Sequence, residues 1–255
     1  IAGLLMLILL VFFIVGYQKG FIGAIVKENS ASSKSVLAKN EQYLEYDNDG
    51  ILRVNKSGDS KMASLITLLK DLKIEFIKNE ILLERNKGEK EFKDIIKNFS
   101  FEIFNVSDFK QIKLLNLPLI INIKKDGEEH YTVLRHIDNN SATIFDPLNG
   151  RVVYKLKELE AIWKGEGLIL WKKLNGINVQ ISKVRPNSEV MSLQEILRSR
   201  NIYNGKIDGY YGSMTEESVK EFQTRSGLKP TGDFDAETHL LLSKEVKGEA
   251  APSLN

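Results

Sequence analysis

Residues 192–242 read SLQEILRSRNIYNGKIDGYYGSMTEESVKEFQTRSGLKPTGDFDAETHLLL, and this stretch decides the fold of the C-terminal part of the chain. Apolar residues recur in it at intervals of three and four, as they do on the buried face of a helix. Glycines stand between the stripes, where a connection needs a positive φ or a close approach of the backbone. We therefore predict three short helices around one small core over residues 187–246. The stripes are Leu193/Ile196/Leu197, Val219/Phe222 and Leu240/Leu241.

Capping signals indicate where these helices begin. Ser192 precedes Glu195 by three residues, and Ser213 precedes Glu216 by three, which is the spacing of a capping box. Asp235 is placed to cap the third helix. Each apolar stripe therefore has a start signal of its own.

The order of residues in this stretch also resembles a known family. Between Asp208 and Gln223 the sequence follows the pattern DG-x-YG-xx-T-xxx-V-xx-FQ. The pattern resembles the peptidoglycan-binding module that is common in cell-wall hydrolases. The resemblance covers residues 187–246 and implies that this part of the chain binds peptidoglycan.

A glycan with attached peptides offers hydroxyls, amides and carboxylates, which tyrosine rings and polar side chains in a shallow groove would match. Asp208, Gly209 and Gly212 have an alternative role as turn formers, and Thr215 one in local hydrogen bonding. The predicted contact residues are Asp208, Gly209, Tyr210, Tyr211, Gly212, Thr215, Gln223 and Arg225.

The middle of the chain changes to a strand pattern. Leu117–Ile123 is a continuous apolar run, which is typical of a buried strand. A turn signal at 138–140 separates two further apolar segments, which are predicted to form a hairpin. A helix is expected to begin at Asp59 or Ser60. This pattern predicts an α+β domain, a helix with an antiparallel sheet, over residues 51–175. The remaining predicted strands are 51–54, 130–137, 141–148, 151–157 and 167–174.

The hairpin places His130 and Asp146 on one face of the sheet as diagonal neighbours. A carboxylate in that position would orient the imidazole; the alternative is a surface histidine near a loop aspartate. A helix start, a strand-borne histidine and an Asp-Pro, in this order, resemble the papain-like peptidases that remove double-glycine leaders from bacteriocin precursors. The resemblance implies that Ser60, His130 and Asp146 stand at the three catalytic positions.

Three departures from that family argue against peptidase activity. Ser60 replaces the cysteine nucleophile, Lys61 replaces the following glycine, and Val54 replaces a glutamine that donates to the oxyanion. A serine hydroxyl is a poorer nucleophile than a partly ionised thiol. Loss of an oxyanion donor costs about 10²–10³ in rate. We therefore expect a vestigial triad and no enzymatic activity.

Residues 1–18, IAGLLMLILLVFFIVGYQ, carry no charge and are long enough to cross a bilayer as one helix. A signal-peptide core would be shorter, with a basic start and a small-residue cleavage site. We predict a membrane helix over 1–18 and a polar spacer over 19–50. The chain begins with Ile1, which leads us to expect further sequence upstream.

Composition excludes several classes of function. The chain has 255 residues, 36 Lys+Arg against 34 Asp+Glu and no cysteine, so disulfides, cysteine-ligated zinc and a thiol nucleophile are absent. No basic arm points to nucleic acid, and no G-x-x-x-x-G-K-[ST] loop points to ATP. A zinc hydrolase would need a ligand cluster, but a third ligand beside His130 and His136 is not evident, since His239 lies in the C-terminal module. We expect no metal and no cofactor.

The order of membrane helix, spacer, degenerate peptidase-like domain and peptidoglycan-binding module resembles the non-cytoplasmic part of the general secretion pathway protein A family. The resemblance implies a single-pass inner-membrane protein with these residues in the periplasm, helping to place the secretin of type II secretion, with an ATPase domain upstream. The expected partners are peptidoglycan, the inner membrane and secretion-system proteins; the oligomeric state stays open. The alternative is a cell-wall hydrolase or a serine-variant peptidase that the same module targets to the wall.

Overall fold

The computed structural model describes residues 45–74, 89–98, 100–178, 181, 183–247 and 254. The predicted membrane helix over 1–18 and most of the predicted spacer lie outside these residues. Every helix inside them is too short or too polar to cross a bilayer. We call residues 45–178 the sheet domain and residues 187–247 the helical module.

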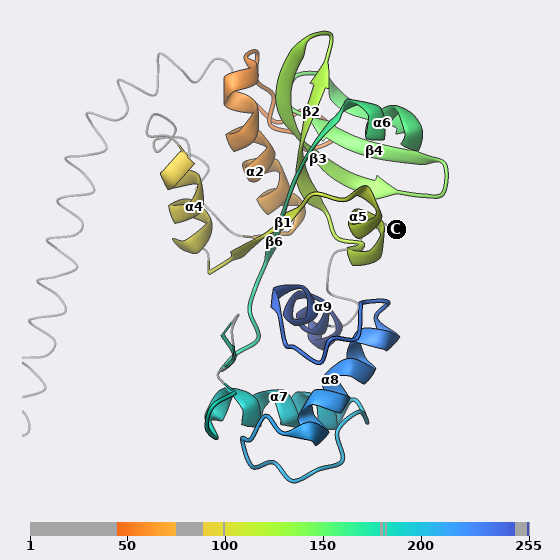
Figure 1. The fold of residues 1–255 in the computed structure, drawn as a ribbon. Coiled ribbons are helices and arrows are strands. Elements are labelled where there is room, and N and C mark those ends of the chain that lie inside the picture. The colour runs from red at the N-terminus through yellow and green to blue at the C-terminus, as the bar shows by residue number, and fades with distance from the viewer. Residues whose placement is uncertain are drawn as a thin grey trace, which may run out of the picture. The chain divides into compact units, whose positions relative to one another are not determined.

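The sheet domain is built on six antiparallel strands in the order β1-β6-β2-β3-β4-β5 (Figure 1). The predicted hairpin is confirmed as β3 and β4, which pair across the turn at 138–140. The buried run predicted as a strand becomes β2, in the middle of the sheet. The strands are β1 (Glu102–Val106), β2 (Leu119–Lys125), β3 (Glu128–Ile137), β4 (Ser141–Asp146), β5 (Gly150–Lys155) and β6 (Trp163–Trp171).

Helix α2 (Ser60–Asp71) begins where the sequence predicts and packs on β3 and β2 (Figure 1). The short 3-10 helix η2 (Ser57–Asp59) leads into it. The predicted strand at 51–54 is wrong. Leu52 forms one isolated bridge, and its backbone N–H donates to Thr67 Oγ1 at 3.0 Å, so this segment is bonded to α2 and not to the sheet.

The predicted strand over 151–157 ends two residues early. Lys155 N donates to the Glu158 side chain at 3.3 Å, and this contact begins a helix at residue 156. The sequence patterns used above predicted none of the other small elements of the sheet domain. These are α4 (Glu89–Asn98), α5 (Phe109–Leu115), α6 (Leu156–Ile162) and β1.

The helical module contains α7 (Ser188–Ser199), α8 (Ser213–Arg225) and α9 (Ala236–Lys247), as predicted. Both predicted capping boxes are wrong. Helix α7 begins four residues before Ser192 because Asn187 caps it, accepting from Val190 N at 3.0 Å. The N-cap of α8 is Gly212, so Ser213 is already helical. The cap at Asp235 is confirmed, since its carboxylate accepts from Thr238 N at 2.8 Å.

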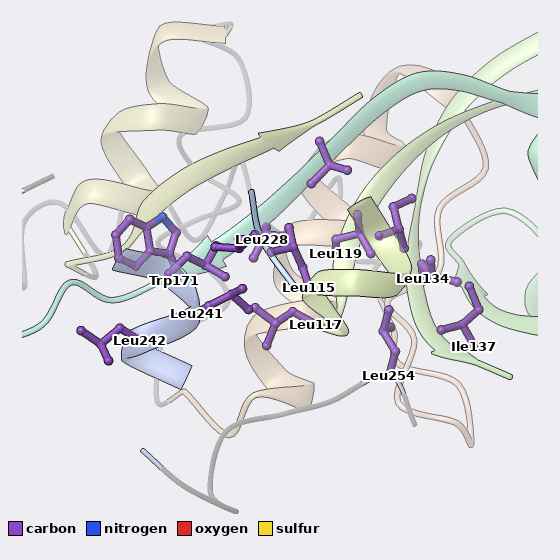
Figure 2. Close-up of a cluster of buried hydrophobic side chains, with 14 of the residues drawn as sticks. Leu115, Leu117, Leu119, Leu134, Ile137, Trp171, Leu228, Leu241, Leu242 and Leu254 are labelled. Atoms are coloured by element: carbon purple, nitrogen blue, oxygen red, sulfur yellow. The ribbon is translucent and has the colours of Figure 1, made fainter. Parts of the chain in front are cut away.

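One hydrophobic cluster joins the sheet domain and the helical module (Figure 2). Trp171 at the end of β6 and Leu115 at the end of α5 belong to it, and so do Leu241 and Leu242 on α9. All four side chains are at most 7% exposed. The module is therefore docked on the sheet domain through α9.

Candidate functional site

The hydroxyl of Ser60 lies at the N-terminus of α2 and is hydrogen-bonded to two neighbouring backbone groups. It donates to Ser57 O at 2.5 Å and accepts from Tyr131 N at 2.9 Å. The residue is 0% exposed. A serine that attacks a substrate must reach it and must give its proton to a base. In this arrangement neither condition is met.

His130 and Asp146 meet as the hairpin register predicts. Nε2 of His130 lies 3.1 Å from Oδ2 of Asp146, and both side chains are buried. Asp146 also accepts from Asn149 Nδ2 and from Leu148 N, both at 2.8 Å. The carboxylate therefore holds the imidazole on one side and the following turn on the other.

Burial would raise the pKa of Asp146, but the hydrogen bonds from His130, Asn149 and the backbone of Leu148 outweigh it and lower the pKa below its usual range. The carboxylate is thus ionised at neutral pH. The other ring nitrogen of His130, Nδ1, is buried and has no hydrogen-bond partner within the described part of the chain. The His130–Asp146 pair is therefore oriented, while the hydroxyl of Ser60 is bonded to the backbone of Ser57 and Tyr131.

The segment before α2 is tied to the turn after β4. Val54 N donates to Pro147 O at 3.0 Å, and Arg53 Nε donates to the same oxygen at 3.1 Å. The Arg53 guanidinium also donates to Leu148 O. At the position where the leader peptidases carry their glutamine, the side chain of Val54 offers no hydrogen-bond donor to an oxyanion.

Lys61, which stands where those peptidases carry glycine, extends into a polar and aromatic cluster beside Ser60. Its Nζ lies 4.7 Å from the centroid of the Tyr131 ring and 5.0 Å from that of Phe92. Glu166 accepts from Tyr131 OH at 2.9 Å and lies 3.9 Å from the ammonium of Lys61. Of the residues in this cluster, only Lys61 was singled out from the sequence. The others lie on separate elements and share no sequence motif.

In the helical module, the buried amide of Gln194 fixes the loop at 208–210. Its Oε1 accepts from Gly209 N at 3.0 Å. Its Nε2 donates to Asp208 Oδ1, to Tyr210 O and to Thr215 Oγ1, each at 3.1 Å. Gly209 has φ +76°, and a Cβ there would lie 2.8 Å from a backbone oxygen, so the loop requires glycine.

Gln223 fixes a second loop, 231–233, in the same way. Its Oε1 accepts from Gly232 N at 2.9 Å, and its Nε2 donates to Thr231 Oγ1, Asp233 O and Thr238 Oγ1 at 3.2, 2.8 and 3.0 Å. Gly232 has φ +78°. The same arrangement therefore occurs twice in the module: a helical glutamine hydrogen-bonds to a glycine loop and to the helix that follows the loop. We call this arrangement a glutamine clamp. This repeat was not predicted from the sequence, although Gln, Gly and Thr occur in the same order in both halves.

The predicted contact residues of the module divide into three groups by exposure. Asp208, Tyr210, Gly212 and Arg225 are exposed, and Tyr210 is the most open large apolar side chain among them, at 58%. Tyr211 is half-buried and donates to Gly232 O at 2.8 Å. The buried residues are Gly209, Thr215 and Gln223. The polar groups of these buried residues form hydrogen bonds within the module. The contact of all eight residues with peptidoglycan stays a prediction.

The joint between the module and the sheet domain is polar as well as apolar. His239 Nε2 accepts from Leu174 N at 3.0 Å. Lys244 Nζ donates to Leu115 O at 2.9 Å and to Asn116 O at 3.1 Å, at the C-terminal end of α5. Among the described residues, no group of three or more His, Asp or Glu side chains could hold a metal ion.

This geometry can be compared with known proteins. Residues 50–175 match the Peptidase C39 family. Residues 186–242 match a family described as a putative peptidoglycan binding domain. The resemblance stated from the sequence, a C39-type domain followed by a peptidoglycan-binding module, is therefore confirmed. No curated protein matches the chain.

Several solved structures are similar to parts of this chain. The periplasmic domain of the EpsAB fusion protein of the Vibrio vulnificus type II secretion system is 14% identical, with a TM-score of 0.45 over 82% of this chain and 84% of that one. A double glycine motif protease from an AMS/PCAT transporter, in complex with its leader peptide, is 20% identical, with a TM-score of 0.40 over 47% and 89%. The peptidase domain of Streptococcus ComA is 19% identical, with a TM-score of 0.40 over 48% and 96%.

Proposed function

We propose that this protein binds peptidoglycan in the periplasm through its helical module, is tethered by the predicted membrane helix over residues 1–18, and assists assembly of a type II secretion complex. The C39-type sheet domain serves as a scaffold without peptidase activity. The two family matches support the modules, and their order after an apolar segment supports the secretion role through its resemblance to general secretion pathway protein A.

The observation that carries the non-catalytic role is the state of Ser60. Its hydroxyl is buried, donates to Ser57 O and accepts from Tyr131 N. A substrate carbonyl would have to displace both contacts. Together with Val54 at the oxyanion position, this supports a sheet domain that keeps the shape of a peptidase and has lost its chemistry.

The second candidate is a serine-variant peptidase, and the His130–Asp146 pair favours it. The pair is intact, buried and oriented, and Nδ1 of His130 has no partner in the described residues. That nitrogen would act as the base if Ser60 turned toward it.

A sacculus pull-down combined with activity assays tests both candidates. The full chain in mild detergent should sediment with purified sacculi, give no clearing band in a peptidoglycan zymogram and leave double-glycine peptides uncut. If the folded chain does not sediment with the sacculi, the wall-binding role is wrong. Cleavage that disappears with Ser60→Ala would establish the peptidase instead, and cleavage that survives would place a catalytic site elsewhere. Co-purification with a secretin-containing complex tests the assembly role.

A further inference from the structure

The end of β3 extends past the strand beside it. In the register of the sheet, the first residue of β2, Leu119, lies opposite Leu134, whereas β3 continues to Ile137. Pro118 comes just before β2 and has no backbone N–H, so it cannot continue the ladder as a donor. The last residues of β3 therefore have no partner on β2 and are open to pairing with another segment on that side.

Leu254, which follows α9 in the chain, pairs with this end of β3. Ile137 N donates to Leu254 O at 2.9 Å. Leu254 N in turn donates to the side-chain oxygen of Asn116, Oδ1, at 3.1 Å. Asn116 and Leu254 are 138 residues apart in the sequence. Both polar backbone groups of Leu254 are thus bonded to the sheet domain, as they are in a segment that is added to the edge of a sheet.

The side chain of Leu254 completes the contact. It is 0% exposed and belongs to the core cluster, together with Leu117 and with Leu134 and Ile137 of β3 (Figure 2). A leucine leaves water entirely in this position, whereas a polar side chain would bring groups that need hydrogen-bond partners. The site therefore combines a backbone donor, a side-chain acceptor and an apolar position that suits leucine.

The backbone of Asn116 prepares its side chain for this role. Asn116 is the C-cap of α5 and has φ 47° and ψ 53°, in the left-handed region that asparagine tolerates better than most residues. Its N–H donates to Ile112 O at 3.0 Å, and its carbonyl oxygen accepts from Lys244 Nζ at 3.1 Å. One residue of the sheet domain therefore holds both α9, through Lys244, and the segment that follows α9, through Leu254.

We propose that the end of β3 and Asn116 form a binding site for an extended peptide segment that carries leucine, and that the segment around residue 254 of the same chain is its ligand. The bound segment fastens the helical module to the sheet domain as a latch, in addition to the contacts of α9. Main-chain hydrogen bonds hold the segment, and the leucine position selects it. The ligand is favoured over a free peptide because it belongs to the same chain.

Hydrogen exchange of the full chain in mild detergent tests the latch. Exchange of the Ile137 amide is followed by mass spectrometry on overlapping fragments. Leu254→Ala should speed this exchange at least about tenfold, because the smaller side chain loses most of its buried apolar contact. The control is the amide of Leu52, which donates to Thr67 Oγ1 elsewhere in the sheet domain and should exchange as it does in the wild type.

A free peptide tests whether the site is a binding site. The peptide EAAPSLN, which has the sequence of residues 249–255, is acetylated at its N-terminus and amidated at its C-terminus. Added at about 5 mM to Leu254→Ala, it should slow the exchange of Ile137 at least about threefold. The same peptide with alanine in place of leucine should have no effect. The wild type should not respond to either peptide, because its own Leu254 occupies the site.

Two variants of Asn116 test the acceptor. Asn116→Asp keeps an oxygen acceptor and tolerates the left-handed conformation, so Ile137 should exchange as slowly as in the wild type. Asn116→Gly keeps only the conformation and should speed the exchange at least about threefold. The difference between the two variants therefore reports the hydrogen bond and not the backbone conformation.

Several outcomes would overturn the proposal. Slow exchange of Ile137 in Leu254→Ala would show that the segment does not protect this amide. Acceleration of Leu52 to the same degree would show a general loss of stability and not the release of a segment. A variant that does not respond to the peptide would contradict a binding site. If the wild type is a dimer that Leu254→Ala converts to a monomer, the ligand comes from a second copy and the latch within one chain is wrong. Failure of the wild type to sediment with sacculi would overturn the proposed function and leave this site unaffected.

Discussion

The imidazole of His239 on α9 and the backbone N–H of Leu174 after β6 are joined by a hydrogen bond of 3.0 Å. Because Nε2 accepts this bond, the ring is neutral and carries its proton on Nδ1. The ring also meets Trp171 edge to face, with centroids 4.8 Å apart. The joint between the helical module and the sheet domain therefore depends on a neutral histidine.

The first prediction is that the joint weakens in acid. Burial, and then the nearby charge of Lys173, lower the pKa of His239 to about 4, whereas Glu102 raises it slightly. The unfolded chain takes up the proton near pH 6.5, so stability is full above that pH and decreases as the pH falls toward 4. The loss across this window is about 3 kcal/mol. Urea unfolding at pH 7, 5.5 and 4.5 measures it.

His239→Gln provides the control, because its side-chain oxygen can accept from Leu174 N but the amide does not titrate. The variant should show a smaller loss of stability between pH 7 and pH 4.5 than the wild type. An unchanged slope would place the acid sensitivity in other groups and contradict the role given to His239.

The sequence predicted the contacts that depend on a short repeat along the chain. Alternation with a period of two, together with the turn at 138–140, was sufficient to bring His130 and Asp146 together. It failed where a stronger local signal competed, as at α7, whose start is set by Asn187 and not by Ser192. It also could not predict the joint, because a single histidine such as His239 has no periodic pattern that reveals what it contacts.

The second prediction concerns Lys244. Burial lowers the pKa of its ammonium, yet the group donates to the backbone oxygens of Leu115 and Asn116. Lys244→Met keeps most of the unbranched apolar stem but leaves both oxygens without this donor. We expect a loss of about 1–3 kcal/mol in the free energy of unfolding. The exposed Lys229→Met should change stability by less than about 0.5 kcal/mol, and an equal effect of the two substitutions would contradict the role of Lys244.

The third prediction tests the repeated clamp. Gln194→Leu and Gln223→Leu are close in size to the native side chain but remove every hydrogen bond that the amide makes. Each should destabilise the module by about 2–4 kcal/mol, since several buried partners lose their bonds at once. Because the two clamps are equivalent, the two losses should be similar. Gln111→Leu, which removes a single bond at 2.6 Å to Glu237, should cost only about 1 kcal/mol.

The last prediction concerns the His130–Asp146 pair. If His130 and Asp146 have a structural role, their contact stabilises the fold. A double-mutant cycle measures this contribution to the free energy of unfolding. Asp146→Ala also frees Leu148 N and Asn149, so it should cost more than His130→Ala. The double variant should lose less than the sum of the single variants, with a coupling of about 1–3 kcal/mol in urea unfolding at pH 7. Additive losses would show that the 3.1 Å contact contributes nothing to the fold. The presence of the His130–Asp146 pair would then be better explained by chemistry than by stability, which would favour the serine-variant peptidase.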